Sequence, residues 1–438
     1  MHLKHIVKAC LFVVISSVVV ISVIEVSTVR PSRVLTHERC PETTSLNDNF
    51  KVNHVEPKSH TDAYENTTDH ESSNLNETSF TVGKPGDTDV LSYVGTNYNM
   101  FKRANVPRNQ KIDNKRHMDN VETCSSYTMP DNIKEWFGNK EIPFTIHKDY
   151  IRQPLNLCPT GAAVDYLIVV HSAVDNVDSR QGIRQTFGRQ DMFTHVTSRL
   201  VFILGTSTTR AVRAWLEVEA DLNNDIVQGD FIDAYVNTTL KAATGVRWVA
   251  ENCPLTKLVI KLDDDVFLQV FGVVEHMIPA MSKRTRHISC SYEPAGVKRL
   301  WRSGTWPVPD NEFPNLTHYP VQHCQGWAVF YTGDLICPLY SAAKVVPSFW
   351  VDDIYLYGLL PYTVGNVTFE SIEKHSMALI VEIGMECLNT AKINCKYLAT
   401  LNHQYTAKRD KWFFTSLWSN ITNNMTLQQS KYFKWQNI

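Results

Sequence analysis

The sequence KLDDDVFL at residues 261–268 places three consecutive carboxylates, Asp263, Asp264 and Asp265, directly after an apolar run typical of a buried strand. Neighbouring negative charges repel one another unless a cation lies among them. Mg²⁺ or Mn²⁺ would serve, because these ions prefer oxygen ligands and are usually held by one or two carboxylates together with substrate phosphates. The triplet therefore points to a metal ion and a phosphorylated ligand, such as a nucleotide sugar. The alternative is a solvated acidic turn or helix cap.

The segments around the triplet indicate an α/β fold. The expected strands are residues 165–173, 199–205 and 257–262. Their continuous apolar runs are typical of a parallel sheet covered by helices on both faces. The expected helices are residues 180–188, 210–222 and 239–253. Alternating strands and helices predict a doubly wound sheet, in which ligands bind beyond the carboxyl ends of the strands. The acidic triplet lies at such an end.

The composition is that of a globular protein and argues against some partners. Of 438 residues, 43% are hydrophobic and 20% are charged, and the formal net charge is −2. This charge gives no reason to expect nucleic acid as a partner. The ten cysteines are too few for a small disulfide scaffold, and they form no CxxC zinc pairs.

The N-terminus has the features of a membrane signal anchor. Residues 1–8 are basic, an uncharged run extends from Ala9 to Ile24, and no small-x-small cleavage motif follows. A cleaved signal peptide is the alternative. Because basic flanks stay in the cytosol, we expect residues 1–8 to form a cytosolic tail. Residues 9–26 would then form one transmembrane helix, with the rest of the chain in the lumen.

Sequons and cysteines agree with a lumenal location. The N-x-S/T triplets begin at Asn66, Asn76, Asn237, Asn315, Asn366, Asn420 and Asn424. So many sequons behind a signal anchor predict glycosylation in the secretory pathway. With Cys10 inside the span, nine cysteines remain for the oxidising lumen. At least one of them is therefore expected to be unpaired or to bond another chain.

Several segments, in the same order, resemble the β1,3-galactosyltransferase and β1,3-N-acetylglucosaminyltransferase family, glycosyltransferase family 31. RQGIRQTFG at 180–188 resembles its R-x-x-I-R-x-T-W-G motif, with Phe187 in place of Trp. Residues 217–241 resemble E-x-x-x-x-x-DI-x-x-x-DF-x-D-x-Y-x-N-L-T-x-K, and KLDDDVFL resembles K-x-DDD-x-F. Later segments, similar to YPxYxxG, EDVYxG and CxYxxxxxxxH, are YPVQHCQGWAVF, DDIYLYG and CKYLATLNH.

The resemblance covers about residues 160–420 and implies a GT-A type, Rossmann-like nucleotide-sugar-binding domain there. It also implies a single-pass type II protein of the Golgi membrane. Residues 27–125 are polar and would form a disordered stem. Residues 126–159 regain apolar side chains and are expected to form an edge segment that packs on the catalytic domain. Residues 421–438 would be a C-terminal tail.

The resemblance also implies roles for single residues at the acidic triplet. Asp265 would reach Mn²⁺ directly, and His403 would complete the metal coordination. Asp263 and Asp264 would lie near the uridine and ribose. Without the CKY match, a lone histidine such as His403 is more often a surface residue or a satisfied core residue.

Three basic residues match family positions that would contact the donor. Arg180 and Arg184 suit phosphate because a guanidinium can form two parallel hydrogen bonds to it. Lys241 would also contact the donor. Their alternative is a solvated, Arg-rich helix face. Trp327 is expected either to stack on a sugar ring or to belong to the core.

Asp353 stands where the family has its catalytic base. A sugar hydroxyl is a poor nucleophile until a carboxylate takes its proton. Asp352 replaces the family's Glu and would either orient the loop or stabilise a helix N-terminus. The segments 319–326 and 352–358 are each one residue longer than the family motifs, so differences are expected on the acceptor side.

These features predict an inverting hexosyltransferase of protein glycosylation. It would move galactose from UDP-galactose, in β1,3 linkage, to a hydroxyl of a glycan acceptor on a glycoprotein or glycolipid. The alternative donor is UDP-N-acetylglucosamine. A second hypothesis is a catalytically silent lumenal glycan-binding or chaperone-like relative. A third, a metal-dependent phosphodiesterase or nuclease, would need clustered His and Asp ligands and a basic surface, which the sequence lacks.

Overall fold

The computed structural model describes residues 124–402, except residue 191, and residues 411–423. The predicted cytosolic tail, the signal anchor and nearly all of the predicted stem lie in residues 1–123, outside the described residues. The same holds for His403 and for most of the predicted C-terminal tail. In the described part of the chain, no helix is long and apolar enough to cross a membrane.

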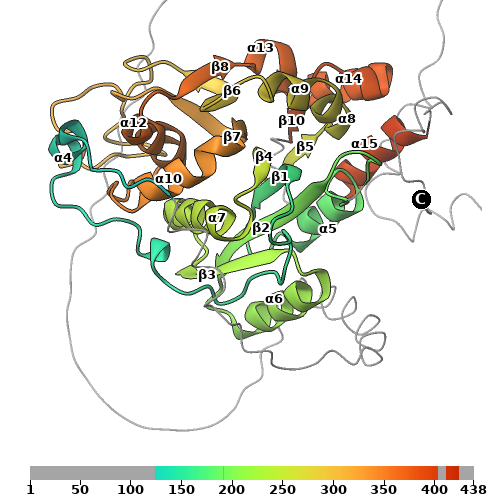
Figure 1. Ribbon diagram of the computed structural model, residues 1–438, viewed down its shortest axis with the longest axis horizontal. Helices are drawn as coiled ribbons and strands as arrows, with labels where there is room; N and C mark the ends of the chain where they lie inside the picture. The colour runs from blue at the N-terminus through green and yellow to red at the C-terminus, as the bar shows by residue number, and fades with distance from the viewer. Residues whose placement is uncertain (1–123, 191, 403–410, 424–438) are drawn as a thin grey trace, which may run out of the picture. The chain divides into compact units, whose positions relative to one another are not determined.

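A seven-stranded sheet, in the order β3-β2-β1-β4-β7-β6-β8, forms the centre of the fold (Figure 1). Its strands are β1 (Val164–His171), β2 (Ser198–Thr206), β3 (Ile226–Ile232), β4 (Thr256–Asp263), β6 (His287–Glu293), β7 (His323–Thr332) and β8 (Thr368–Ser371). A smaller sheet has the order β5-β10-β9. It contains β5 (Val266–Leu268), β9 (Met377–Ala378) and β10 (Ala399–Leu401).

Helices connect these strands. The longer ones are α5 (Val177–Gln185), α6 (Arg210–Asn223), α7 (Thr238–Asn252), α10 (Ile336–Ala343), α14 (Val381–Ala391) and α15 (Lys411–Thr422). The shorter ones are α4 (Asp131–Phe137), α8 (Val270–Gly272), α9 (Ile278–Met281), α11 (Asp352–Ile354), α12 (Leu360–Val364) and α13 (Glu373–Ser376). The three strands and three helices expected from sequence are confirmed as β1, β2 and β4 and as α5, α6 and α7, with ends shifted by up to three residues.

The main sheet is parallel in one half and mixed overall. β3, β2, β1 and β4 are parallel, as expected from their continuous apolar runs. β7 is antiparallel to both β4 and β6, which makes the whole sheet mixed. The apolar pattern of β7 does not reveal this direction, because a strand buried on both faces is apolar throughout whichever way it runs.

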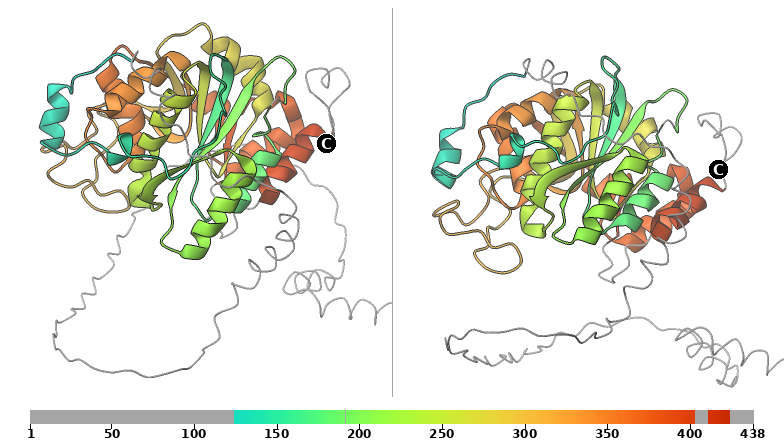
Figure 2. Two further views of the ribbon diagram at one scale, coloured as in Figure 1. Left: turned by 60° about the horizontal axis from the view of Figure 1, so that its bottom comes forward. Right: turned by 90° about the horizontal axis from the view of Figure 1, so that it is seen from below.

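Helices cover both faces of the sheet, which explains the unbroken apolar runs. In β1, Leu167 and Val169 face the core beneath α7, α10 and α12. The alternate residues Tyr166, Ile168 and Val170 face the core beneath α5, α6 and α15. Figure 2 shows these two helical layers on opposite sides of the strands. Successive side chains of a strand point to opposite faces, so both sets must be apolar.

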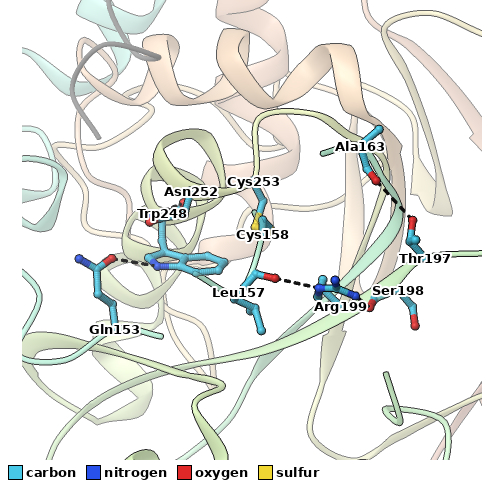
Figure 3. The surroundings of a disulfide bond; sticks show 10 residues. All are labelled: Gln153, Leu157, Cys158, Ala163, Thr197, Ser198, Arg199, Trp248, Asn252 and Cys253. Atoms are coloured by element: carbon cyan, nitrogen blue, oxygen red, sulfur yellow. Dashed lines mark hydrogen bonds between the residues drawn. A yellow bond between two sulfur atoms is a disulfide. The ribbon is translucent and has the colours of Figure 1, made fainter. Parts of the chain in front are cut away.

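All eight cysteines in the described part of the chain form disulfides. The pairs are Cys124–Cys337, Cys158–Cys253, Cys290–Cys324 and Cys387–Cys395. The first two fasten the segment before β1 to α10 and to the end of α7. Figure 3 shows the second bond beside Trp248 and beside Leu157, whose carbonyl accepts a hydrogen bond from Arg199. The ninth cysteine expected in the lumen, Cys40, lies outside the described residues.

Candidate active site

The carboxyl end of β4, which pairs with β1, forms one edge of a cleft of about 470 Å³. The strand order reverses between these two parallel neighbours, and such a switch point is where doubly wound sheets bind ligands. His171 at the end of β1 pairs with Asp263 at the end of β4. Asp263, Asp265, Asp352 and Asp353 all line the cleft. The fold therefore brings two acidic motifs, about 90 residues apart in sequence, to one place.

Asp353, in the short helix α11, is held against Gly326 of β7. The Gly326 N–H donates a hydrogen bond to the Asp353 carboxylate. A side-chain carbon at position 326 would lie only 1.8 Å from Oδ1 of Asp353. The β6–β7 pairing shifts between Cys290 and Ser291, beside this glycine, and the irregularity lets the Gly326 backbone serve the site. The carboxylate occupies space that only a glycine leaves open.

Lys261, a buried residue of β4, bonds both to the acidic triplet and to Gly326, the residue that contacts Asp353. Its Nζ donates to Oδ1 of Asp263 at 2.7 Å and to the carbonyl of Gly326 at 2.6 Å. Burial lowers the pKa of Lys261, but the carboxylates of Asp263, Asp352 and Asp353 outweigh burial and raise that pKa. The ammonium therefore stays charged and neutralises part of the acidic cluster.

The two carboxylates of α11 share a raised affinity for protons. Burial and then the neighbouring Asp352 carboxylate raise the pKa of Asp353 to about 7, against the opposing effects of Lys261 and of the Gly326 N–H. Burial also raises the pKa of Asp352, although Lys261 lowers it. Because the two groups lie side by side, ionisation of one makes ionisation of the other less favourable. A carboxylate with a pKa near 7 suits proton transfer at physiological pH.

His171 lies beside Asp352, with its Nδ1 4.0 Å from Oδ2. Burial, followed by the charges of Lys261 and Lys241, holds the pKa of His171 well below its usual value. The imidazole is therefore neutral, and its contact with Asp352 is not an ion pair. Asp352 itself begins α11, where a carboxylate is favoured by the partial positive charge of a helix N-terminus.

Arg180 and Arg184 are turned towards the protein. All five N–H groups of Arg180 donate to protein acceptors, namely both carboxylate oxygens of Glu219, the hydroxyl of Ser172 and the carbonyls of residues 173 and 174. Arg184 donates to Glu219 and to both oxygens of Asp225. All five N–H groups of Arg180 and three of those of Arg184 are thus bonded inside the fold, so the solvated alternative is wrong. Direct contact with donor phosphate stays a prediction.

Lys241 and Asp264 hold the same loop after β1. The Nζ of Lys241 donates to the carbonyl of Ser172 at 2.6 Å and to Asp233 at 2.9 Å. Oδ2 of Asp264, which is buried, accepts from the Ser172 hydroxyl and from Nδ2 of Asn176, both at 2.7 Å. Three residues predicted to bind the donor thus shape the loop 172–176. Asp263, by contrast, lines the cleft.

Comparison with known proteins points to one family. Residues 178–367 match the family model described as galactosyltransferase. Over these residues the chain is similar to the galactosyltransferase family. It is 29% identical over 264 residues to human beta-1,3-galactosyltransferase 5, covering 59% of this chain and 83% of that protein. It is 28% identical over 239 residues to mouse beta-1,3-galactosyltransferase 1, covering 54% and 72%. The protein is accordingly a galactosyltransferase enzyme.

Solved structures give a weaker comparison. The galactosyltransferase aligns with the WbbM bifunctional glycosyltransferase at a TM-score of 0.31 and 13% identity, over 65% of this chain and 53% of that one. It aligns with mouse xyloside xylosyltransferase 1 at a TM-score of 0.28 and 13% identity, over 56% and 100%. Scores this low do not establish a common fold, so the family assignment rests on sequence.

Asp265, one of the two predicted metal ligands, lies where two chain segments meet. It precedes β5, which pairs with β10, and the N–H of Asn402 donates to the Asp265 carbonyl at 2.9 Å. The other predicted ligand, His403, lies outside the described residues. Within the described ranges, no group of three or more His, Cys, Asp or Glu side chains is arranged to hold a metal. The oxygen donors of Asp263 and Asp265 nevertheless suit Mn²⁺, which needs few protein ligands when a phosphate and water complete its shell.

Sequence reasoning missed three features of this galactosyltransferase. Lys261, Gly326 and Tyr235 were visible only as members of matched motifs, with no role in the site assigned to them. Trp306 came from a segment with no recognised pattern. Trp327, for which both stacking and a core position were considered, is buried and also lines the cleft.

Proposed function

We propose that this galactosyltransferase transfers galactose from UDP-galactose to a glycan hydroxyl in β1,3 linkage, with inversion at the anomeric carbon. The observation that carries the proposal is the Asp353 carboxylate, held by Gly326 in the same cleft as Asp263 and Asp265. The similarity to two beta-1,3-galactosyltransferases supports galactose and the β1,3 linkage. UDP-N-acetylglucosamine is the second candidate donor, because the matched motifs belong to both kinds of transferase.

In this proposal Asp353 is the catalytic base. Its carboxylate accepts the proton of the acceptor hydroxyl while the hydroxyl oxygen forms a bond to the anomeric carbon. The bond from that carbon to the UDP oxygen breaks at the same time, and its electron pair leaves with UDP. If Asp353 acts as a base and no carboxylate forms a covalent bond to the sugar, the reaction is a single displacement and therefore inverts the anomeric carbon.

Asp265 and Asp263 would hold Mn²⁺, with His403 as a further ligand. When bound, the ion would balance the negative charge that develops on the departing UDP. Lys261 would not bind the donor directly in this proposal, because its ammonium is already bonded to Asp263 and Gly326. The loop 172–176, braced by Arg180, Lys241 and Asp264, would form one wall of the nucleotide site in a GT-A type domain.

The proposed setting is the Golgi lumen, with residues 9–26 as the anchor of a type II membrane protein and residues 27–125 as its stem. Supporting this, the described part of the chain contains four disulfides, which persist in oxidising compartments. The sequons agree, because glycosylation takes place in the same pathway. Acceptors would then be glycans on glycoproteins or glycolipids.

The test measures acceptor-dependent UDP release by the purified full chain. The chain would be given UDP-galactose or UDP-N-acetylglucosamine, a glycan panel and Mn²⁺, with and without EDTA. We expect release with UDP-galactose that stops with EDTA and in Asp353→Asn. Asp310→Asn is the matched control, because the Asp310 side chain is 95% exposed and does not line the cleft. A folded chain that binds UDP and Mn²⁺ but transfers neither sugar would favour the silent relative.

A further inference from the structure

Three large aromatic side chains are exposed together in the active-site cleft. Tyr235, Trp301 and Trp306 are 64%, 52% and 50% exposed, and all of them line the cleft that contains Asp353. Folded proteins seldom leave such side chains in water in one place without a binding role. Tyr235 precedes α7, whereas the two tryptophans belong to the long connection between β6 and β7. Separate parts of the chain thus supply one aromatic surface.

The rings of this surface are fixed in position. Nε1 of Trp306 donates to the hydroxyl of Tyr235 at 2.6 Å. The next residue, Pro307, accepts a hydrogen bond from Nε1 of Trp350 at 3.0 Å. The guanidinium of Arg299 lies over the Trp301 ring, 4.8 Å from its centre. Because these contacts use ring edges or one ring face, the aromatic surface stays exposed while its geometry is set before a ligand binds.

The connection that carries the tryptophans is also held at its base. Nη1 of Arg302 donates to the carbonyls of Pro309 and Glu312, and Nη2 donates to the carbonyl of Phe313. Phe313 itself is fully buried in the core. The two tryptophans therefore belong to a braced segment, and a ligand that contacts them need not order a loose loop.

The aromatic surface lies close to the catalytic carboxylates. Burial raises the pKa of the Tyr235 hydroxyl, the hydrogen bond from Trp306 lowers it, and the carboxylates of Asp352 and Asp353 raise it further. A ligand that presents a hydroxyl to Asp353 would thus extend over this surface. The polar neighbours in the cleft, Glu293, Lys298 and Gln325, provide donors and acceptors for hydroxyl groups.

We propose that Tyr235, Trp301 and Trp306 form a subsite for an inner sugar unit of the acceptor. The C–H face of a pyranose ring is apolar and flat enough to cover an aromatic ring, whereas its hydroxyl edge needs the polar neighbours. The enzyme would then prefer oligosaccharide acceptors over monosaccharides, because only a longer chain reaches both Asp353 and the aromatic surface. This inference rests on the proposed transfer to a glycan.

The test compares acceptors of different length on the full chain. A monosaccharide glycoside and the matching tetrasaccharide would be assayed with UDP-galactose, using wild type, Trp306→Ala and Trp306→Phe. We expect the ratio of kcat/KM for the tetrasaccharide to that for the monosaccharide to fall about tenfold in Trp306→Ala. It should fall much less in Trp306→Phe, which keeps a ring, while the KM for UDP-galactose changes by less than about twofold. Trp215→Ala is the control, because Trp215 is 37% exposed on α6 and does not line the cleft.

Other outcomes would overturn the subsite. An unchanged ratio in Trp306→Ala would mean that the ring does not bind the acceptor. A rise in the KM for UDP-galactose instead would place the nucleobase on this surface. Direct titration of the tetrasaccharide, with UDP and Mn²⁺ present, separates the subsite from the reaction. Binding that Trp306→Ala abolishes supports the subsite even if no sugar is transferred, whereas no binding to wild type refutes it.

Discussion

Replacing Gly326 by alanine should disable the galactosyltransferase without preventing its folding. The backbone of Gly326 is not in the left-handed region, so an alanine can adopt its conformation. The new carbon, however, would lie 1.8 Å from Oδ1 of Asp353 and 2.8 Å from its Cγ. Side-chain carbons practically never approach other atoms closer than 3.0 Å. The carboxylate would therefore have to retreat by about 1.2 Å and give up the hydrogen bond from the Gly326 N–H.

The size of the effect follows from that displacement. A misplacement of about 1 Å in a reacting group costs about 100-fold in rate. The lost hydrogen bond to a charged carboxylate contributes about 1.5–3 kcal/mol to the same change. We therefore expect kcat of Gly326→Ala to fall at least about 100-fold. The crowding should lower the free energy of unfolding by about 1–3 kcal/mol, which leaves a folded protein.

The assay combines acceptor-dependent UDP release with thermal unfolding and UDP titration. Gly245→Ala is the matched control. Its new carbon would lie 3.3 Å from Ile203, which needs only a small adjustment, and alanine favours helix α7. A second comparison places Gly326→Ala in an Asp353→Ala background. With no carboxylate to displace, the glycine substitution should then cost less than about twofold. A folded Gly326→Ala enzyme that keeps kcat within about threefold of wild type would refute the assignment of Asp353.

Two further predictions concern charge. Because the pKa of Asp353 in the free protein is raised to about 7 and the base must be unprotonated, kcat/KM for UDP-galactose should fall as pH falls, by about tenfold per unit well below pH 7. A rate that is flat from about pH 5.5 to pH 8 would contradict this assignment. Lys261→Met removes the cation that lowers the pKa of Asp353, so the acid limb of the profile should move to higher pH. Lys257→Met is the control, because Lys257 is on the same strand but pairs with Asp165 outside the cleft, and it should leave the acid limb in place. An unmoved acid limb in Lys261→Met would show that the ammonium does not act on the base.

Much of the parallel half of the fold could be predicted, because its information is local. The strands β1, β2 and β4 are continuous apolar runs, and their helices repeat apolar residues every three or four positions. The antiparallel strands β6 and β7 were not predicted as such. A strand's direction depends on which neighbour it pairs with, and that neighbour is set by the path of a connection about 30 residues long.

The three carboxylates of the acidic triplet do not have the same surroundings, and the motif alone does not reveal this. Asp263 ends β4, and Asp264 and Asp265 form the turn before β5, so the three carboxylates do not share one direction. The structure divides them accordingly. Asp263 and Asp265 line the cleft, whereas Asp264 is turned to Ser172 and Asn176. The triplet itself is visible in the sequence, but the loop that binds the middle carboxylate is not, since it lies about 90 residues away.

The same reasoning applies to the two arginines of α5. A helix that carries Arg180 and Arg184 reads as solvated or phosphate-binding when it is considered alone. In the fold, Glu219 of α6 and Asp225 before β3 meet these guanidinium groups. A buried charge needs such partners, since leaving one unpaired would cost several kcal/mol. The motif identifies the two arginines but not their partners, which are determined by the packing of α5 on α6.

The question raised by three adjacent carboxylates therefore has two answers, one inside the protein and one outside it. Lys261 is the cation that the chain supplies, and it serves Asp263 and, through the Gly326 carbonyl, the site of Asp353. One ammonium does not neutralise the acidic cluster, and the raised pKa values of Asp352 and Asp353 are the consequence. The remaining negative charge favours binding of a divalent cation, and the resulting fall in the affinity of Asp353 for protons would make it a base only when the donor complex is assembled.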